Sequence, residues 1–314
     1  MRSIVFALGA ILALAQPVNA GEIQIAILTS TPSGIWYPLG MTLSSIYGKT
    51  ISGARVTVQA TAGSVENLRL MENGDGELAF TLGGTLEDAW GGNKAAGFDR
   101  ALTKLRAIAR VYPYFVQFVA SNQSGVKTLT DLKGKRVSIG PEGSGSAFDA
   151  ARVFQAAGFT AAELANVANA PFGPSFRKVS QGELDAAMTS GGLGIEMVRH
   201  LMASMQATLV AIPGEIVGKI DGKAYIAATI PAGTYDGQPA DVPTAEGHNF
   251  LVTREGVSDD VAYIMAKSLF ENLRQLVETD PAAKGIDIKT ATVGVPIPLH
   301  PGAERYYREA GILK

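Results

Sequence analysis

A turn rich in glycine and serine carries the clearest chemical signal in the sequence. Three glycines alternate with Ser144 and Ser146 between a β-branched segment at 136–139 and a helical segment at 148–157. A strand that enters a helix through such a turn gathers backbone N–H groups and the positive end of the helix dipole, which together hold an anion. No acid or base in this turn is equipped for catalysis. The turn therefore indicates binding, although a tight turn without a ligand stays the alternative.

Signatures of catalysis are missing elsewhere. The three histidines, His200, His248 and His300, lie far apart in the sequence, and no GxSxG, HExxH or Walker motif occurs. The chain has no cysteine, which excludes disulfides, thiolate metal sites and cysteine nucleophiles. The segment 73–77 resembles part of a calcium loop but lacks its spacing, so it is interpreted as the end of a helix. We predict no catalytic residue, no metal and no cofactor.

Three further turns share the glycine and hydroxyl character of the first. They lie at 29–34, 62–67 and 190–194, and each follows a segment that reads as a strand. In open α/β sheets, ligands bind outside the carboxyl ends of the strands. Two turns fall in each half of the chain, so we expect two lobes whose facing turns line one cleft.

The elements that must position these turns alternate along the chain. Short β-branched runs alternate with helical runs, which favours an α/β fold with mainly parallel sheets. Strands are expected at 22–28, 55–60, 77–81, 107–109, 116–120, 136–139, 185–188, 208–212, 225–230 and 249–253. Helices are expected at 37–47, 65–72, 148–157, 175–181, 195–205, 258–278 and 303–310. Ser64 and Ser258 are predicted to be helix caps, and Gly74 and Gly158 are predicted to end helices.

Composition limits the class of protein further. Residues 1–20 join Arg2, an apolar run and a Val18–Ala20 cleavage site, which is typical of a secretory signal peptide; an uncleaved anchor is the alternative. Without Arg2 the chain has 26 basic and 29 acidic side chains (27 − 1 against 29), a charge of −3. No basic tract occurs, so nucleic acid is not an expected partner. About 294 residues is close to the size at which one core divides into two.

Five segments in order carry a resemblance to a known family. They are 36–40 (WYPLG), 62–70 (AGSVENLRL), 132–146 (LKGKRVSIGPEGSGS), 268–272 (SLFEN) and 296–307 (PIPLHPGAERYY). Together they resemble the TAXI subfamily of receptors for TRAP transporters over nearly the whole chain after residue 20. The chain departs from the family pattern at 32–36, where a diglycine is usual, and at 189–194, which is unusually rich in glycine.

The resemblance implies a two-lobed α/β fold of the type II periplasmic binding proteins, each lobe a mainly parallel sheet flanked by helices. It implies a first lobe at 21–115 and 250–314 and a second lobe at 116–249, joined by two crossover hinge segments. It also implies a ligand cleft between the lobes.

Ligand-binding residues are carried over from the family's pocket segments. They are Ser30, Thr31, Tyr37, Gly63, Ser64, Asn67, Gly143, Ser144, Gly145 and Ser146, with Tyr112 and Ser190 added on weaker grounds. Tyr112 could equally belong to a hinge. Arg110 and Arg177 are the arginines considered for a carboxylate, with pairing or solvent exposure as the alternatives.

The function implied is a periplasmic receptor of a sodium-coupled uptake system. Its expected ligand is a small carboxylate or amino acid such as glutamate or 2-oxoglutarate, and its expected partner is a TRAP membrane permease. We expect a monomer. A periplasmic enzyme acting on a small carboxylate and a ligand-binding partner of a sensor kinase are the alternatives.

Overall fold

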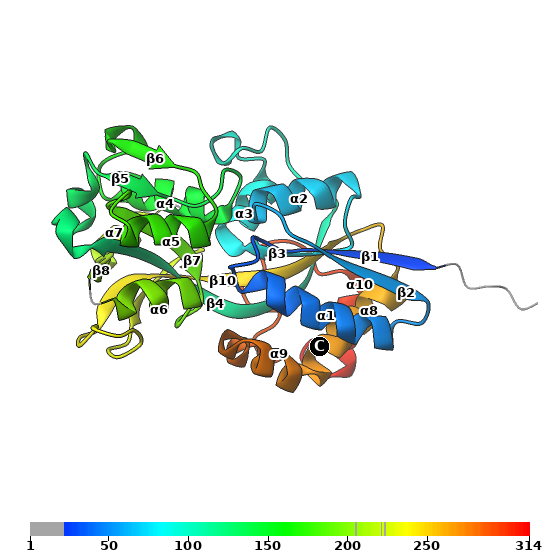
Figure 1. The fold of residues 1–314 in the computed structure, drawn as a ribbon. Helices are drawn as coiled ribbons and strands as arrows, with labels where there is room; N and C mark the ends of the chain where they lie inside the picture. Colours follow the sequence, from blue (N-terminus) through cyan, green and yellow to red (C-terminus); the bar gives the residue numbers. More distant parts are fainter. Residues whose placement is uncertain (1–21, 205, 221, 223) are drawn as a thin grey trace, which may run out of the picture.

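The computed structural model describes residues 22–204, 206–220, 222 and 224–314, and a mixed sheet runs through the whole of it (Figure 1). The strand order is β2-β1-β3-β10-β4-β7-β5-β6, with β8 paired to β4 and β9 paired to β10. The strands are β1 (Ile23–Leu28), β2 (Ala54–Gln59), β3 (Leu78–Leu82), β4 (Leu105–Ser121), β5 (Arg136–Ser138), β6 (Asn166–Ala168), β7 (Ala186–Gly191), β8 (Ala207–Val210), β9 (Ile226–Ile230) and β10 (Val242–Arg254). The predicted signal peptide lies outside the described residues.

Helices cover the sheet in two groups. They are α1 (Trp36–Thr50), α2 (Ser64–Asn73), α3 (Gly83–Gly91), α4 (Gly145–Ala156), α5 (Phe172–Ser180), α6 (Glu196–Ala203), α7 (Gly214–Val217), α8 (Asp259–Glu271), α9 (Leu273–Thr279) and α10 (Pro301–Glu309). Figure 1 shows α1–α3 and α8–α10 gathered around β1–β3, and α4–α7 gathered around β5–β8. We call the first group the first lobe and the second group, with β9, the second lobe.

Two long strands connect the lobes. β4 pairs with β10 in the first lobe and with β7 and β8 in the second, and β10 in turn pairs with β3 and β9. The apolar runs on either side of Tyr112, which were expected as two strands, therefore form one strand of 17 residues. All these central pairs are antiparallel, whereas the outer pairs β1–β2, β1–β3, β5–β6 and β5–β7 are parallel. The expected α/β fold is confirmed, with a sheet that is mixed as a whole.

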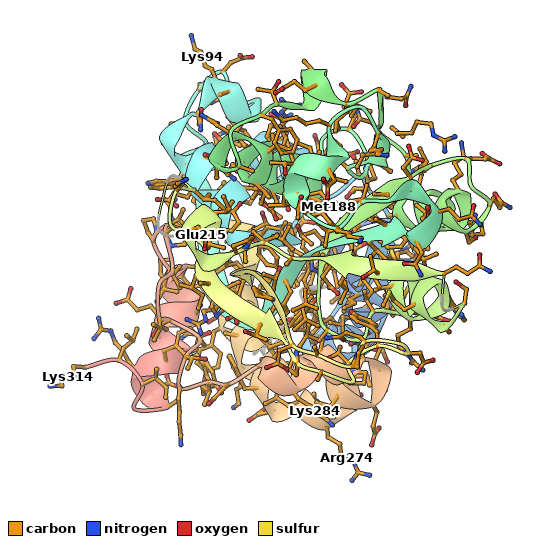
Figure 2. All side chains as sticks on the ribbon, turned by 90° about the vertical axis from the view of Figure 1, so that its left-hand side faces the viewer. Lys94, Met188, Glu215, Arg274, Lys284 and Lys314 are labelled. Atoms are coloured by element: carbon orange, nitrogen blue, oxygen red, sulfur yellow. The ribbon has the colours of Figure 1, made fainter. Side chains whose placement is uncertain are left out.

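The core joins the two lobes. Buried apolar side chains form one large cluster that includes Ile25 of β1, Phe118 of β4 and Phe154 of α4. Figure 2 shows the side chain of Met188 inside the molecule, whereas those of Lys94 and Arg274 extend away from it. Burial of this apolar surface is the main force that folds the chain, which has no disulfide to assist it.

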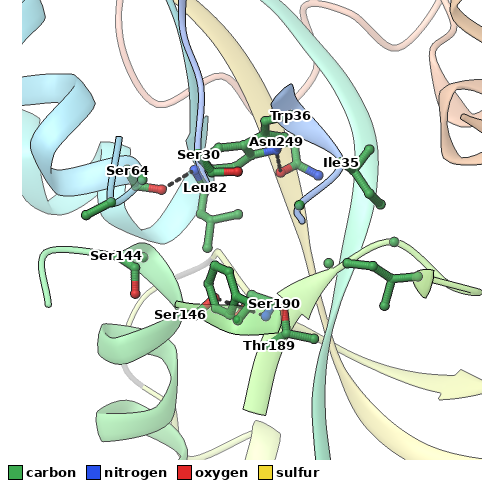
Figure 3. Close-up of a pocket in the computed structure, with 18 of the residues that line it drawn as sticks. Ser30, Ile35, Trp36, Ser64, Leu82, Ser144, Ser146, Thr189, Ser190 and Asn249 are labelled. Carbon is green, nitrogen blue, oxygen red and sulfur yellow. Dashed lines mark hydrogen bonds between the residues drawn. The ribbon is translucent and has the colours of Figure 1, made fainter. Parts of the chain in front are cut away.

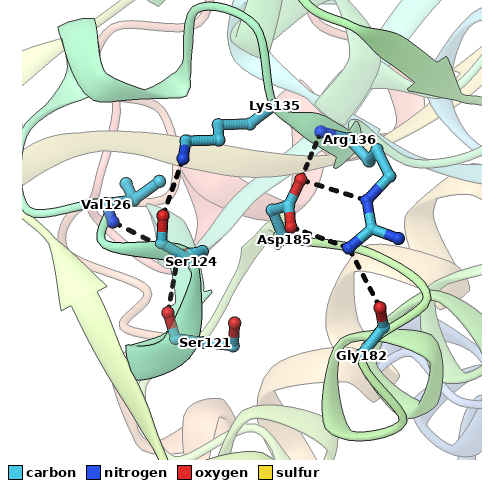
Figure 4. A network of polar contacts seen from close by, with 7 residues as sticks. All are labelled: Ser121, Ser124, Val126, Lys135, Arg136, Gly182 and Asp185. Carbon is cyan, nitrogen blue, oxygen red and sulfur yellow. Dashed lines mark hydrogen bonds and ion pairs between the residues drawn. The ribbon is translucent and has the colours of Figure 1, made fainter.

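A polar clasp closes the far side of the second lobe (Figure 4). Arg136 begins β5, and its guanidinium donates to both carboxylate oxygens of Asp185, which precedes β7, at 2.8 and 3.2 Å. The same arginine donates to the carbonyl of Gly182 at 2.9 Å. Hydrogen bonds from Arg136 lower the pKa of Asp185. The clasp fixes the start of two parallel strands whose opposite ends reach the cleft.

Several local predictions are settled by these elements. Ser258 caps α8 by accepting the N–H of Val261, and Gly74 ends α2 with a left-handed φ of 93°. The helix predicted over 258–278 is instead broken at Asn272, whose side chain donates to the carbonyl of Ser268 and competes with the helical pattern. No helix in the described part of the chain is long and apolar enough to span a lipid bilayer.

Candidate functional site

A small cavity lies between the lobes, where turns from both converge (Figure 3). It offers about 40 Å³ to the centres of water-sized molecules. Eight of the twelve predicted ligand-binding residues line it: Ser30, Gly63, Ser64, Tyr112, Ser144, Gly145, Ser146 and Ser190. The structure thus brings residues 160 positions apart in the sequence to one place, at the carboxyl ends of the strands.

The other four predicted residues lie outside the lining. Asn67 is fully buried, and its amide donates to the carbonyls of Thr29 and Phe80 at 2.7 and 2.9 Å, so it joins α2 to β1 and β3. Tyr37 is the second residue of α1 and is outside the lining, whereas Trp36, the first residue of that helix, is part of it. Thr31 and Gly143 likewise belong to the turns without contributing to the lining. None of these four side chains forms part of the described cavity wall.

The start of α2 contributes the first wall. Gly63 precedes the helix with a φ of 124°, a conformation that side-chain-bearing residues rarely adopt. Ser64 is not the helix cap that the sequence predicted: its Oγ accepts the N–H of Leu82 at 3.1 Å and so ties α2 to the end of β3. The backbone cap is Gly63, since Ser64 already has helical geometry.

The start of α4 contributes the opposite wall. The helix begins at Gly145, three residues earlier than predicted, because Ser144 caps it by accepting the N–H of Ala147 at 3.2 Å. Ser146 Oγ accepts the N–H of Ser190 at 3.0 Å, which fixes the end of β7 against α4. The positive end of the α4 dipole therefore faces the cavity.

The connecting strands form the floor. The register of β10 against β4 shifts between His248 and Phe250, and this irregularity sets Asn249 in the cavity wall. Asn249 Oδ1 accepts the indole N–H of Trp36 at 3.1 Å, and its amide donates to the carbonyl of Tyr112 at 2.9 Å. Trp36 also stacks on Phe80, with ring centroids 5.8 Å apart. These contacts tie the first loop to both connecting strands.

The phenol of Tyr112 is unusual among the lining groups. The side chain is 1 % exposed and its hydroxyl has no hydrogen-bond partner among the described residues. Burial, with a contribution from Asp280, raises the pKa of this phenol well above its ordinary value, so it keeps its proton. A buried hydroxyl without a partner is costly, and a bound ligand would supply one.

The lobes are in contact around the cavity. The N–H of Val65 in α2 donates to the carbonyl of Gly143 at 3.1 Å, and the N–H of Gly173 donates to Ser33 Oγ at 3.2 Å. A Cβ added to Gly145 would lie 2.7 Å from both Leu82 Cδ1 and Ser64 Oγ. Such close packing across the cleft describes a closed arrangement of the lobes.

A charged seam flanks the cavity. Arg152 of α4 pairs with Asp88 of α3 and donates to the hydroxyl of Tyr225 at 3.1 Å. Tyr225 and Ser190 both donate to the carboxylate of Asp149 at 2.5 Å. Burial raises the pKa of Asp149 to about 6, although these two hydrogen bonds and Arg152 lower it. Ser190 is thus shared between the seam and the cavity.

Groups that could do chemistry lie elsewhere. His300 Nδ1 accepts the N–H of Gly302 and caps α10, while His200 lies on the exposed face of α6. Arg110 donates to the carbonyl of Val293 at 3.4 Å and Arg177 lies in a separate groove, so neither arginine reaches the cavity. Among the described residues, no group of three histidine or carboxylate side chains could hold a metal ion.

Eleven lining residues were not among the twelve predicted ligand contacts. They are Gly34, Ile35, Trp36, Ala62, Leu82, Phe172, Thr189, Gly191, Gly192, Ile195 and Asn249. Gly34, Ala62, Gly191 and Gly192 lie within the turns at 29–34, 62–67 and 190–194 that were expected to line the cleft, although they were not named as contacts. Leu82, Phe172 and Asn249 carried no signal, because only the tertiary arrangement brings them to the cleft.

Comparison with known proteins places the chain in a family. It belongs to the NMT1-like family, whose model matches residues 27–311. PhnD1 of Prochlorococcus marinus, solved with methylphosphonate, has a TM-score of 0.58 at 12 % identity and covers 93 % of this chain and 100 % of its own. A Xanthomonas citri protein bound to chloride has a TM-score of 0.51 at 11 % identity, covering 92 % and 97 %.

A third structure is the alkanesulfonate-binding protein SsuA of Xanthomonas axonopodis pv. citri bound to MOPS. Its TM-score is 0.48 at 16 % identity, covering 92 % of this chain and 84 % of that chain. At these identities the likeness concerns the fold, which the first two structures support. The family shown is a broader class than the TAXI subfamily suggested by the sequence segments.

Proposed function

We propose that this chain is a solute-binding receptor that captures a small carboxylate or an amino acid between its two lobes. One observation carries the proposal: turns at the starts of α2 and α4 face each other across a cavity lined by hydroxyls. Two helix starts supply favourable potential for an anion without any charged side chain. The fold, which resembles that of the methylphosphonate complex of PhnD1, supports the proposal.

The residues proposed to contact the ligand are those predicted residues that line the cavity. Ser64 and Gly63 act from the first lobe, and Ser144, Gly145 and Ser146 act from the second. In our proposal Thr31, Tyr37, Asn67 and Gly143 support these turns from outside the cavity. Ser30, Tyr112 and Ser190 complete the wall.

Closure is proposed to occur about the connecting strands. The lobe boundaries expected from the sequence, at 115/116 and 249/250, fall inside β4 and β10. Bending of both strands near Tyr112 and Asn249 would separate the turns and admit ligand. Ligand that contacts both lobes stabilises the closed state by the difference between its affinities for the two states.

The membrane partner and location are proposed from the sequence resemblance. We propose a periplasmic monomer that delivers its solute to a TRAP permease. Uptake by proteoliposomes containing the neighbouring permease would test this. Dependence of uptake on a sodium gradient supports a TRAP partner, whereas dependence on ATP indicates an ABC transporter. Solute-dependent phosphorylation of a sensor kinase, without uptake, would indicate the sensor alternative.

A thermal-shift screen tests the receptor function itself. The chain from residue 21 is stripped of ligand by partial unfolding, refolded, and heated with amino acids, carboxylates, phosphonates, sulfonates and sugars. A solute at 100 times its dissociation constant adds about 2.7 kcal/mol of stability, roughly 5 °C for a protein of this size. No shift with any solute contradicts the proposal. Chemical conversion of a bound solute, followed by NMR, would favour the enzyme alternative.

A further inference from the structure

The hydrogen-bonding capacity of the cavity is one-sided. Ser64, Ser144 and Ser146 each accept a backbone N–H, at 3.1, 3.2 and 3.0 Å respectively. A serine hydroxyl has one proton to donate. None of the three O–H groups donates to another of the described residues, so each proton is available to the cavity. Each accepted N–H uses one of the two lone pairs of its hydroxyl and leaves the proton free to donate to a ligand.

Tyr112 adds a fourth donor. Its hydroxyl is buried, lacks a partner and lines the same cavity, and it approaches from the connecting strand rather than from a helix start. This group is independent of the helix dipoles. An acceptor placed between the helix starts and this phenol would satisfy it.

The described wall has no carboxylate to pair with a positive charge. Among the described lining residues none is acidic. The carboxylate of Asp149 lies behind Ser190 and is occupied by Ser190 and Tyr225, with Arg152 next to it. Asp280 is also outside the lining, and its carboxylate accepts the N–H of Ala282 at 2.8 Å. The amide oxygen of Asn249 is taken by Trp36.

We propose that the cavity selects compact oxyanions that carry no ammonium group. The inference rests on the proposed receptor function and narrows its ligand class: organic acids, phosphonates or sulfonates are bound, and the corresponding amino compounds are rejected. An ammonium group would lose its hydration and meet donors instead of acceptors. One water occupies about 10–15 Å³ of such space, so a cavity of about 40 Å³ suits a head group with few carbons.

Matched pairs of solutes test the class by calorimetry on the chain from residue 21. The pairs are pyruvate with L-alanine, 2-oxoglutarate with L-glutamate, methylphosphonate with aminomethylphosphonate, and methanesulfonate with taurine. We expect at least one oxyanion to bind, and to bind ten or more times more tightly than its amino partner. The pair that binds identifies the head group as carboxylate, phosphonate or sulfonate.

Failure of the class and failure of the receptor function give different results. If an amino compound, a neutral sugar or a polyamine binds as tightly as any oxyanion, the proposed oxyanion selectivity is wrong, but the receptor function is supported. If none of these solutes binds, both are overturned.

A single hydroxyl tests the fourth donor. Tyr112→Phe should weaken binding of the preferred oxyanion about tenfold without lowering the melting temperature, because the hydroxyl donates to none of the described residues. Tyr114→Phe is the control in the same strand: its hydroxyl is equally buried but interacts with Tyr225 and Asp149 of the seam and does not line the cavity. Equal affinities for Tyr112→Phe and the wild type would overturn the role of this phenol.

Discussion

Two neighbouring regions join the lobes by different means. The cavity brings together hydroxyls, glycines and apolar groups, and its described lining has no charged side chain. The adjoining seam joins α3 to α4 through Asp88, Arg152, Tyr225 and Asp149, which form a charged network. Charge that attracts the lobes to each other is thus kept out of the space that receives the solute.

This separation has a physical reason. An arginine in the cavity would hold an anion strongly and would also need a partner whenever the site is empty. An unpaired neutral donor costs less in the empty state than an unpaired charge would, and the helix starts supply the field. The seam can hold the lobes together through an ion pair because both partners come from the protein. Ser190, which faces the cavity and donates to Asp149, is the contact between the two regions.

Removal of Arg152 should have the largest effect. Arg152→Met leaves the carboxylates of Asp88 and Asp149 without their cation, and the side chains of the Arg152–Asp88 pair are only 19 % and 10 % exposed. Breaking a largely buried pair from one side costs about 3–5 kcal/mol, and we expect a loss near the lower value in the free energy of unfolding in urea. Ligand affinity should also fall, because the pair spans the lobes.

Arg136→Met is the control for this prediction. It breaks a pair with Asp185 that lies within the second lobe and is more exposed. We expect a smaller loss of stability and unchanged ligand affinity. Equal effects of the two variants on affinity would contradict the view that the seam acts across the cleft.

The pH dependence of stability should identify Asp149. Burial raises its pKa from 3.8 to about 6, so the folded protein favours the neutral carboxyl. The stabilisation from this group is complete below pH 3.8 and is lost as the pH rises through 6, a loss of about 3 kcal/mol. Asp149→Asn keeps a neutral group at the site, so its unfolding free energy should not show this loss between pH 4 and pH 7. If the unfolding free energies of the wild type and Asp149→Asn change with pH in parallel, Asp149 is not the group responsible.

The sequence was informative where local chemistry decides structure. The turns at 62–67 and 143–146 could be predicted to meet at one cavity because glycine and hydroxyl spacing there is dictated by strand-to-helix geometry. Of the strands in the outer parallel pairs, β1, β2, β3, β5 and β7 were predicted from short apolar runs beside turns, whereas β6, a strand of only three residues, was not predicted. Both signals are contained within about ten residues.

The seam could not be predicted. Asp88, Arg152 and Tyr225 belong to three segments with no local pattern in common, and only the packing of α3 against α4 unites them. Asn249 was missed for a similar reason, because it enters the wall through a register shift between β10 and β4. The break of the helix at Asn272 was missed because it depends on the conformation of that side chain, which donates to the carbonyl of Ser268. Ser64 was wrongly predicted to be a cap because its hydroxyl instead accepts the N–H of Leu82, which is distant in the sequence.

Obstruction of the cleft should weaken binding by tenfold or more. Gly145→Ala places a Cβ 2.7 Å from Leu82 and Ser64 of the opposite lobe, which prevents full closure. Gly48→Ala is the matched control, since Gly48 lies within α1 and a Cβ there meets nothing within 4 Å. We expect Gly48→Ala to add up to about 1 kcal/mol of stability and to leave affinity unchanged. Calorimetry should show that Gly145→Ala binds ligand weakly, and small-angle scattering with ligand should show that its lobes stay apart. An affinity equal to that of the wild type would mean that the lobes close in a different way.

The smallest effects should come from single donors of the cavity. Ser64→Ala and Ser144→Ala each remove one hydroxyl proton from the ligand, which should weaken binding by about 1–2 kcal/mol, or roughly 5- to 30-fold. Ser144→Ala should also lower the melting temperature, because Ser144 caps α4, whereas the exposed Ser45→Ala on α1 should change neither property. Affinity and melting temperature measured on the same samples separate the two roles of Ser144. If both cavity variants bind like Ser45→Ala, the donors lie elsewhere, and the contrast between a neutral binding cavity and a charged seam no longer describes how this protein holds its solute.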